Sequence, residues 1–172
     1  ELQDLRIDNV EDVVRMTPNV GFASLGDGRS TYMSIRGIGP MAQPLGNDDT
    51  SVVVYVDGVP QPLFASDQNL LDVERVEVLR GPQGTLFGRN AQAGAINIVT
   101  RKPTDTLEIE AGTEFGTRNY RHAWASVSGP IVQDKLSGRL AIGYSGQDGE
   151  VRNLAGPDVG DLSSPSLRGT LV

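Results

Sequence analysis

The sequence lacks cysteine and has almost no histidine. The absence of cysteine excludes a disulfide framework, a thiolate metal site and a cysteine nucleophile. The single histidine, His122, excludes a site that needs two imidazoles, and a Ser-His-Asp catalytic group would have to use this residue. No run of about 18 apolar residues occurs, so we expect no transmembrane helix. We therefore expect neither a resident metal nor a cofactor.

Positive charge is also scarce. The chain has 15 Lys and Arg residues against 22 Asp and Glu residues, which gives a formal net charge of −7. Basic side chains form no run of five residues. A protein that holds nucleic acid needs clustered Lys and Arg side chains to meet the phosphate backbone. Nucleic acid is therefore excluded as an expected partner.

Glycine and proline, in contrast, are abundant. The 172 residues include 21 glycines and 10 prolines, and neither recurs with a fixed period. This composition favours a turn-rich β protein over a helical bundle or a collagen. The opening ELQDLRIDN has no signal-peptide pattern, and the closing GTLV lies inside a predicted strand. We expect the chain to be a piece of a larger protein.

The first part of the chain combines one short helix with several short strands. Asp8 or Asn9 can cap a helix that Pro18 ends. The apolar face of this helix is formed by Val10, Val13, Val14 and Met16. Glycine, serine and aspartate predict a loop over residues 21–30. The predicted strands cover residues 32–36, 52–56, 74–79 and 95–100, and the second is apolar enough to be covered on both faces.

The pattern changes after Pro103. Apolar and polar residues alternate over residues 107–115, 122–128 and 136–145, and a fourth segment begins near Leu167. The predicted turns cover residues 116–119 and 130–135, and a long connection covers 147–164. Segments of about 9–11 residues suit tilted strands that cross a bilayer. A soluble antiparallel sheet would show the same alternation, so the pattern alone leaves both open.

The candidate catalytic and ion-binding motifs do not hold. The glycine-rich segment over residues 81–94 has no Gly-Lys-Ser/Thr ending, and Pro82 removes a backbone donor that a phosphate cradle needs. The acidic cluster Asn47-Asp48-Asp49 does not match a Ca²⁺-binding loop. Exposed strand faces explain the carboxylate pairs. The sequence thus predicts no enzyme.

Two arginines stand out because each precedes a glycine at the end of a predicted strand. They are Arg36, in Ile-Arg-Gly, and Arg80, in Leu-Arg-Gly. An arginine held by a short glycine turn suits a bidentate carboxylate partner. The chemistry alone is equally consistent with two exposed arginines.

Three stretches carry a family resemblance. YMSIRGIG, VVVYVDGVPQ and VERVEVLRGPQGTLFGRNAQAGAINIVTRKP together resemble the plug domain of TonB-dependent outer-membrane receptors. The stretch GTRNYRHAWASVSGPIVQDKLSGRLAIGYSGQDG is similar to the first strands of that family's barrel. The resemblance implies a plug domain over residues 1–103 and the start of a β-barrel over residues 104–172. The implied fold is an α+β plug, a small mixed sheet with short helices, before the first antiparallel strands of a truncated 22-stranded transmembrane barrel.

The resemblance also implies a function. Such receptors lie in the bacterial outer membrane, in contact with its lipid, and bind scarce nutrients, often ferric siderophores. TonB then acts on the plug, which gates the barrel from the periplasmic side. The family's signal peptide and TonB box are not in this sequence, so no residue can be assigned to contact TonB.

The resemblance assigns six residues. The apical plug loops would be Met41–Asn47, Phe64–Asp67 and the turn at Phe87. Ligand contacts are expected from Gln43, Phe64, Ser66 and Phe87. Arg36 and Arg80 match plug arginines that pair with barrel glutamates, in a plug–barrel latch.

Two alternatives stay open at this point. One is a soluble β-rich module that binds a ligand or glycan, which would need a closed core and a complete last strand. The other is a signalling receptor of the same family, which carries an additional N-terminal domain. The sequence does not name the ligand, because related receptors also take haem, cobalamin, metal chelates or oligosaccharides.

Overall fold

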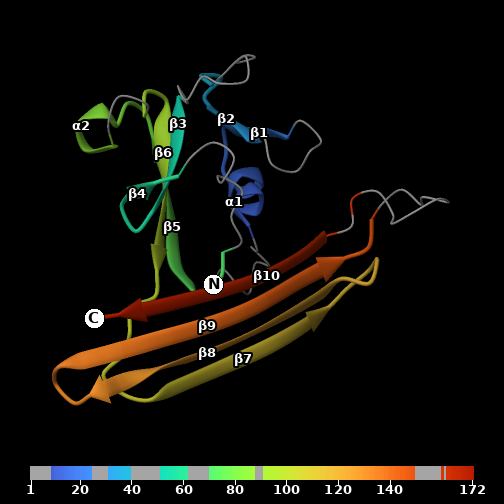
Figure 1. Ribbon diagram of the computed structural model, residues 1–172. Coiled ribbons are helices and arrows are strands. Elements are labelled where there is room, and N and C mark those ends of the chain that lie inside the picture. The colour runs from blue at the N-terminus through green and yellow to red at the C-terminus, as the bar shows by residue number, and fades with distance from the viewer. Residues whose placement is uncertain are drawn as a thin grey trace. The chain divides into compact units, whose positions relative to one another are not determined.

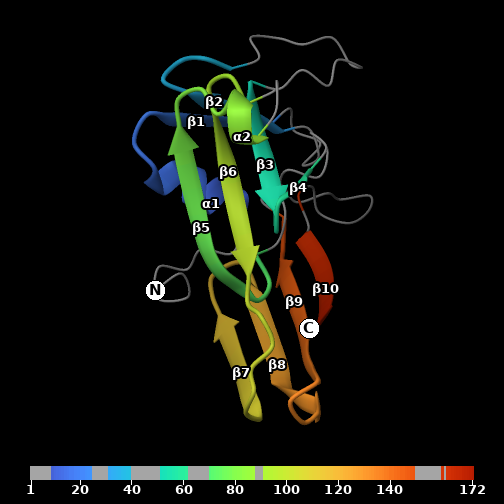
Figure 2. The ribbon, with the colours of Figure 1, turned by 90° about the vertical axis from the view of Figure 1, so that its left-hand side faces the viewer.

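The computed structural model forms two compact units, Glu1–Thr100 and Arg101–Val172, shown in Figures 1 and 2. It describes residues 9–24, 31–39, 51–61, 70–87, 91–149, 160 and 162–172. The first unit holds two short helices, a two-stranded sheet and a four-stranded sheet, and the second holds one four-stranded sheet. Neither helix, nor any other in the described part of the chain, is long and apolar enough to span a membrane.

Helix α1 (Val10–Met16) begins where the sequence predicts it. The Asn9 side chain accepts a hydrogen bond from the Asp12 N–H (2.9 Å), and the Asp12 carboxylate accepts one from the Asn9 N–H (3.3 Å). This reciprocal capping box satisfies amide donors that have no partner within the helix. Val10, Val13 and Val14 are buried, but Met16 is 55% exposed, so its expected place on the apolar face is wrong. At about 100° per residue, Met16 lies well away from the stripe that Val10 and Val14 form.

A two-stranded sheet follows the helix. Strand β1 (Val20–Ser24) pairs antiparallel with β2 (Thr31–Ile35), with Val20 opposite Ile35. Residues 21–24 of the predicted 21–30 loop are therefore strand, so the expectation is wrong for these four residues, and residues 25–30 lie outside the described residues. Gly21 has a pairing role, because a Cβ there would lie 2.6 Å from the Ser34 Oγ. The glycine lets the two strands approach and is not a loop signal here.

The larger sheet of the first unit is mixed. Its strands are β3 (Val52–Val56), β4 (Val59–Pro60), β5 (Val73–Arg80) and β6 (Gly94–Thr100), in the order β4-β3-β6-β5. Strand β6 runs parallel to β3 and antiparallel to β5. The first four residues of β3 are buried, which confirms the expectation for a continuous β-branched run.

Apolar clusters form in the first unit around this sheet. One joins α1, β2, β3 and β6 and includes the fully buried Ile35, Ile96 and Ile98. The other is formed by Val53, Tyr55, Ala91 and Ala95, with Phe87 and Leu79 against it. Because Val53 and Tyr55 alternate with Val52 and Val54 along β3, the two clusters lie on opposite faces of the sheet. Phe87 ends the short helix α2 (Gly84–Phe87), which the sequence did not predict.

The second unit is an antiparallel meander. Strands β7 (Glu108–Phe115), β8 (Arg121–Val132), β9 (Leu136–Gln147) and β10 (Leu162–Leu171) pair in chain order. Strand β8 continues past Pro130, which lies opposite Ser137, so the turn predicted from residue 130 begins at residue 133.

One face of the meander is apolar and exposed. The alternation places Ile109, Val127, Leu140 and Ile142 on this face, where they are 72%, 41%, 48% and 52% exposed. The opposite face is polar, with the cross-strand rows Glu110–Ser126–Ala141–Arg168 and Glu108–Ser128–Arg139–Thr170. A sheet face whose large apolar side chains remain exposed requires another apolar surface to cover it.

Candidate functional site

The segment that carries Phe87 packs on the four-stranded sheet of the first unit. The ring of Phe87 meets that of Tyr55 edge to face, with centroids 4.8 Å apart and planes at 64°. The Tyr55 hydroxyl also donates a hydrogen bond to the Phe87 carbonyl. Phe87 is half-buried in this contact. Its place at a ligand site stays a prediction, and its packing on Tyr55 is a contact that the sequence did not reveal.

Backbone hydrogen bonds fix both ends of this segment. The Gly81 N–H donates to the Ala93 carbonyl and the Gln83 N–H to the Ala91 carbonyl, each over 2.9 Å. The Phe87 N–H donates to the Gln83 carbonyl over 2.8 Å. Gly81 has a φ of 103°, a conformation that favours glycine, which explains the glycine after Arg80. The glycine-rich motif therefore builds a fixed turn beside the sheet.

The two predicted latch arginines lie at strand ends and are exposed. Arg36 follows β2 with a φ of 54°, and its N–H donates to the Asn19 carbonyl over 2.8 Å. Arg80 is the last residue of β5. The carboxylates expected to bind them would belong to barrel strands outside this chain, so the latch stays a prediction. Gln43, Phe64 and Ser66 lie outside the described residues.

An exposed ion-pair network lies on β5. The Arg75 side chain contacts Glu77 over 2.8 Å and Glu74 over 2.9 Å. Hydrogen bonds from Arg75 and then from Asn97 lower the pKa of the Glu77 carboxyl, and the Glu77 contact raises the pKa of Arg75. Glu74 and Glu77, a carboxylate pair in the sequence, are thus engaged with an arginine between them.

A second charged cluster lies on the polar face of the meander. The Arg101 Nη1 is 2.6 Å from the Glu110 Oε2, and the Arg139 Nη2 is 3.9 Å from the same oxygen. The Arg139 Nη2 also donates to the Ser126 Oγ over 3.3 Å. Alternation places Glu110 and Arg139 on one face but does not reveal that they meet, because that depends on strand register. Within the described ranges, no three His, Cys, Asp or Glu side chains lie close enough to hold a metal ion.

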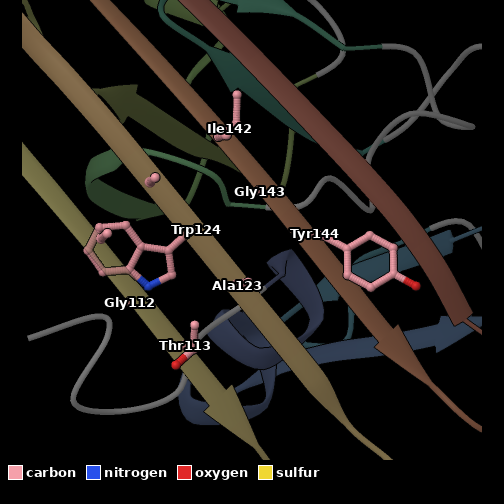
Figure 3. Close-up of a pocket in the computed structure, with 9 residues that line it drawn as sticks. Gly112, Thr113, Ala123, Trp124, Ile142, Gly143 and Tyr144 are labelled. Atoms are coloured by element: carbon pink, nitrogen blue, oxygen red, sulfur yellow. The ribbon is translucent and has the colours of Figure 1, made fainter.

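A hollow of about 470 Å³ lies over β7, β8 and β9, and Figure 3 shows its lining. Six of its nine residues belong to the apolar face, and they are Ala111, Thr113, Ala123, Ala125, Ile142 and Tyr144. The other three form one cross-strand row, in which Trp124 lies between Gly112 and Gly143. A Cβ on Gly112 would meet the indole at 2.7 Å, so the glycine makes room for the tryptophan.

Comparisons with known proteins agree on one family. The family model of the TonB-dependent Receptor Plug Domain matches residues 1–95. The chain is 38% identical over 157 residues to the pesticin receptor of Yersinia pestis. The aligned region covers 90% of this chain and 23% of that receptor. It is 28% identical over 145 residues to the catecholate siderophore receptor Fiu of Escherichia coli K12, covering 82% of this chain and 18% of that receptor.

Solved structures agree in fold. The ferric yersiniabactin uptake receptor FyuA from Yersinia pestis matches with a TM-score of 0.85 and 32% identity, over 99% of this chain and 27% of that one. The receptor in the FpvAI–pyocin S2 complex matches with a TM-score of 0.80 and 21% identity, over 99% of this chain and 21% of that one. The chain therefore spans about a quarter or less of its relatives' length. The family match and these relatives confirm the resemblance: the chain belongs to the TonB-dependent receptors and comprises the plug domain and the first strands of the barrel.

Proposed function

We propose that the whole protein is an outer-membrane receptor that takes up a ferric siderophore with energy supplied through TonB. The observation that carries this proposal is the order of the two units, a plug domain followed at once by strands with one apolar and one polar face. The names of the relatives add the ligand class, since Fiu is a catecholate siderophore receptor and FyuA takes up ferric yersiniabactin. We assign no catalytic step to this chain.

The apolar face of β7–β10 would contact the outer-membrane lipid. Its strands are 8–12 residues long, close to the length that a tilted strand needs to cross a bilayer. Ile109 and Leu167 are more than 70% exposed, which is costly in water and favourable in hydrocarbon. The polar face would line the lumen that the plug closes.

The ligand would be recognised by plug loops together with the barrel. Phe64 offers apolar or stacking contact, and Gln43 and Ser66 offer hydrogen-bond donors and acceptors. Phe87 would contribute only the part of its ring that the Tyr55 contact leaves exposed. Arg36 and Arg80 would bind barrel carboxylates and hold the plug in its resting position.

Uptake by the full-length receptor tests the proposal. The receptor is expressed in cells that lack siderophore receptors and siderophore synthesis, and radioactive iron is supplied as the catecholate, yersiniabactin or pyoverdine complex. We expect energy-dependent uptake of at least one complex, and none in cells that carry the empty vector. Uptake of haem or cobalamin but of no ferric siderophore would contradict the ligand class. Failure to take up any nutrient would contradict the receptor function.

A further inference from the structure

The short connector between the plug and the barrel strands is bound to the polar face of the meander. It comprises residues 101–107, which belong to the second unit. The Arg101 guanidinium binds the Glu110 carboxylate on β7 over 2.6 Å. The Thr104 N–H donates to the Ser128 Oγ on β8 over 2.9 Å, and the Thr104 and Ser128 hydroxyl oxygens lie 2.8 Å apart. We call the Arg101–Glu110 and Thr104–Ser128 contacts together the connector clamp.

The surroundings of the clamp show that it is built into the sheet. Ser128 is 1% exposed, so its hydroxyl depends on Thr104 for hydrogen bonding in place of water. Gly129 lets the connector pass close to β8, because a Cβ there would lie 3.2 Å from the Leu107 Cα. Glu110 also faces the buried Arg139, so one carboxylate receives guanidinium groups from the connector and from β9.

The plug side of the same junction is also fixed. Thr100 is the last residue of β6, and its N–H and hydroxyl donate to the Asp57 carboxylate over 2.9 Å and 2.8 Å. Asp57 lies in the turn after β3, with a φ of 49°. Thr100 is therefore bound to Asp57 within the plug. The next residue, Arg101, is bound to Glu110 within the barrel unit.

We propose that the connector clamp is a permanent anchor that stays closed during transport, so that the plug moves only in the part before Arg101. This inference rests on the proposed function. An unattached linker would let the plug leave the barrel while it stays tethered by the chain. The hydrogen bond of Thr104 to the buried Ser128 and the ion pair of Arg101 with Glu110 hold the linker against the barrel strands and resist this movement. The opening that transport needs must then come from movement of residues 1–100, either as a body about the link to Arg101 or by rearrangement within it.

A reversible cross-link tests the anchor. Thr104→Cys with Ser128→Cys places two sulfur atoms where the hydroxyl oxygens are 2.8 Å apart, so a small side-chain rotation forms the S–S bond of about 2.05 Å, and this chain has no cysteine to interfere. In the full-length receptor, any other cysteine is replaced and the uptake of the ferric siderophore is measured before and after reduction. We expect oxidised and reduced receptors to differ by less than twofold. A tenfold loss on oxidation that reduction restores would overturn the proposal, and each single cysteine variant serves as control.

A second measurement does not depend on transport. In the full-length receptor, Ser128→Ala removes the acceptor of the Thr104 N–H, and we expect the exchange of that amide hydrogen to become at least tenfold faster. The matched control is Ser126→Ala, on the same strand and face but in contact with Arg139, which should leave the Thr104 amide unchanged. Unchanged exchange in Ser128→Ala would overturn the clamp itself. A wild-type receptor that takes up no ferric siderophore would contradict the proposed function but leave this result intact.

Discussion

Replacing Phe87 by alanine separates a packing role from a ligand-binding role. A fully buried phenylalanine costs about 3–5 kcal/mol of stability when truncated to alanine. Part of Phe87 stays exposed, so we expect a smaller loss, of about 2 kcal/mol, within which the edge-to-face contact with Tyr55 contributes about 0.5–1.5 kcal/mol. The truncation also removes the apolar contacts of Phe87 with the cluster that includes Val53, Ala91 and Ala95.

Tyr55→Phe is the matched variant. It keeps the ring contact and removes only the hydroxyl that donates to the Phe87 carbonyl. The net value of such a hydrogen bond is about 1 kcal/mol, and the carbonyl that it leaves can turn to another donor or to water. We therefore expect Phe87→Ala to destabilise the plug more than Tyr55→Phe.

Hydrogen exchange at the β3 and β6 amides of the full-length receptor is the appropriate assay, because it reports the free energy of opening this part of the plug. A loss of about 2 kcal/mol corresponds to exchange roughly 30-fold faster. Ligand affinity, corrected for the fraction of folded plug, should fall less than tenfold. Exchange that is unchanged in Phe87→Ala, together with a large loss of affinity, would refute the packing argument and make Phe87 a ligand contact first.

Four further predictions follow from other parts of the chain. The Arg75 guanidinium lowers the pKa of the Glu77 carboxyl below its ordinary value of 4.5. The contribution of this contact to the stability of the fold is therefore fully present above pH 4.5 and is lost as the pH falls through the lowered pKa. An NMR titration of the Glu77 carboxyl with a midpoint at or above 4.5 would contradict this. Arg36→Ala and Arg80→Ala should make cells that carry the receptor more permeable to detergent, because a stranded carboxylate costs about 3–5 kcal/mol, and wild-type permeability and uptake in both would refute the latch. Phe64→Ala should weaken ligand binding about ten- to a hundredfold in a titration while the thermal unfolding of the plug stays almost unchanged, and a large fall in melting temperature would place Phe64 in the core. A fragment of residues 101–172 should aggregate or require detergent, because its edge strands and apolar face are exposed, and a monodisperse solution without detergent would count against the barrel assignment.

Local signals in the sequence predicted the elements that local chemistry determines. The capping residue Asn9 indicated the start of α1, and the β-branched run over residues 52–56 predicted a strand buried on both faces.

Features that depend on a distant partner could not be predicted. Strand β1 contains Gly21, and a glycine in the sequence predicts a loop. Only the pairing of Gly21 with Ser34 on β2 explains it as a strand residue. Helix α2 has four residues, too few for a helical period to be visible. The connector clamp joins Thr104 to Ser128 on β8 and Arg101 to Glu110 on β7, and both contacts depend on the path of the connector over the paired strands. The candidate ligand contacts came from resemblance alone, since no spacing of residues indicated them.

The dependence of iron uptake on TonB decides whether the whole protein is an energy-coupled receptor. The full-length receptor is expressed in two strains that lack siderophore receptors and siderophore synthesis, one with TonB and one without it. Binding of the radioactive ferric siderophore at the cell surface and its entry into the cell are measured separately. We expect equal surface binding in both strains and entry only in the strain with TonB. Equal entry in both strains would show that uptake does not depend on TonB and would rule out the proposed function.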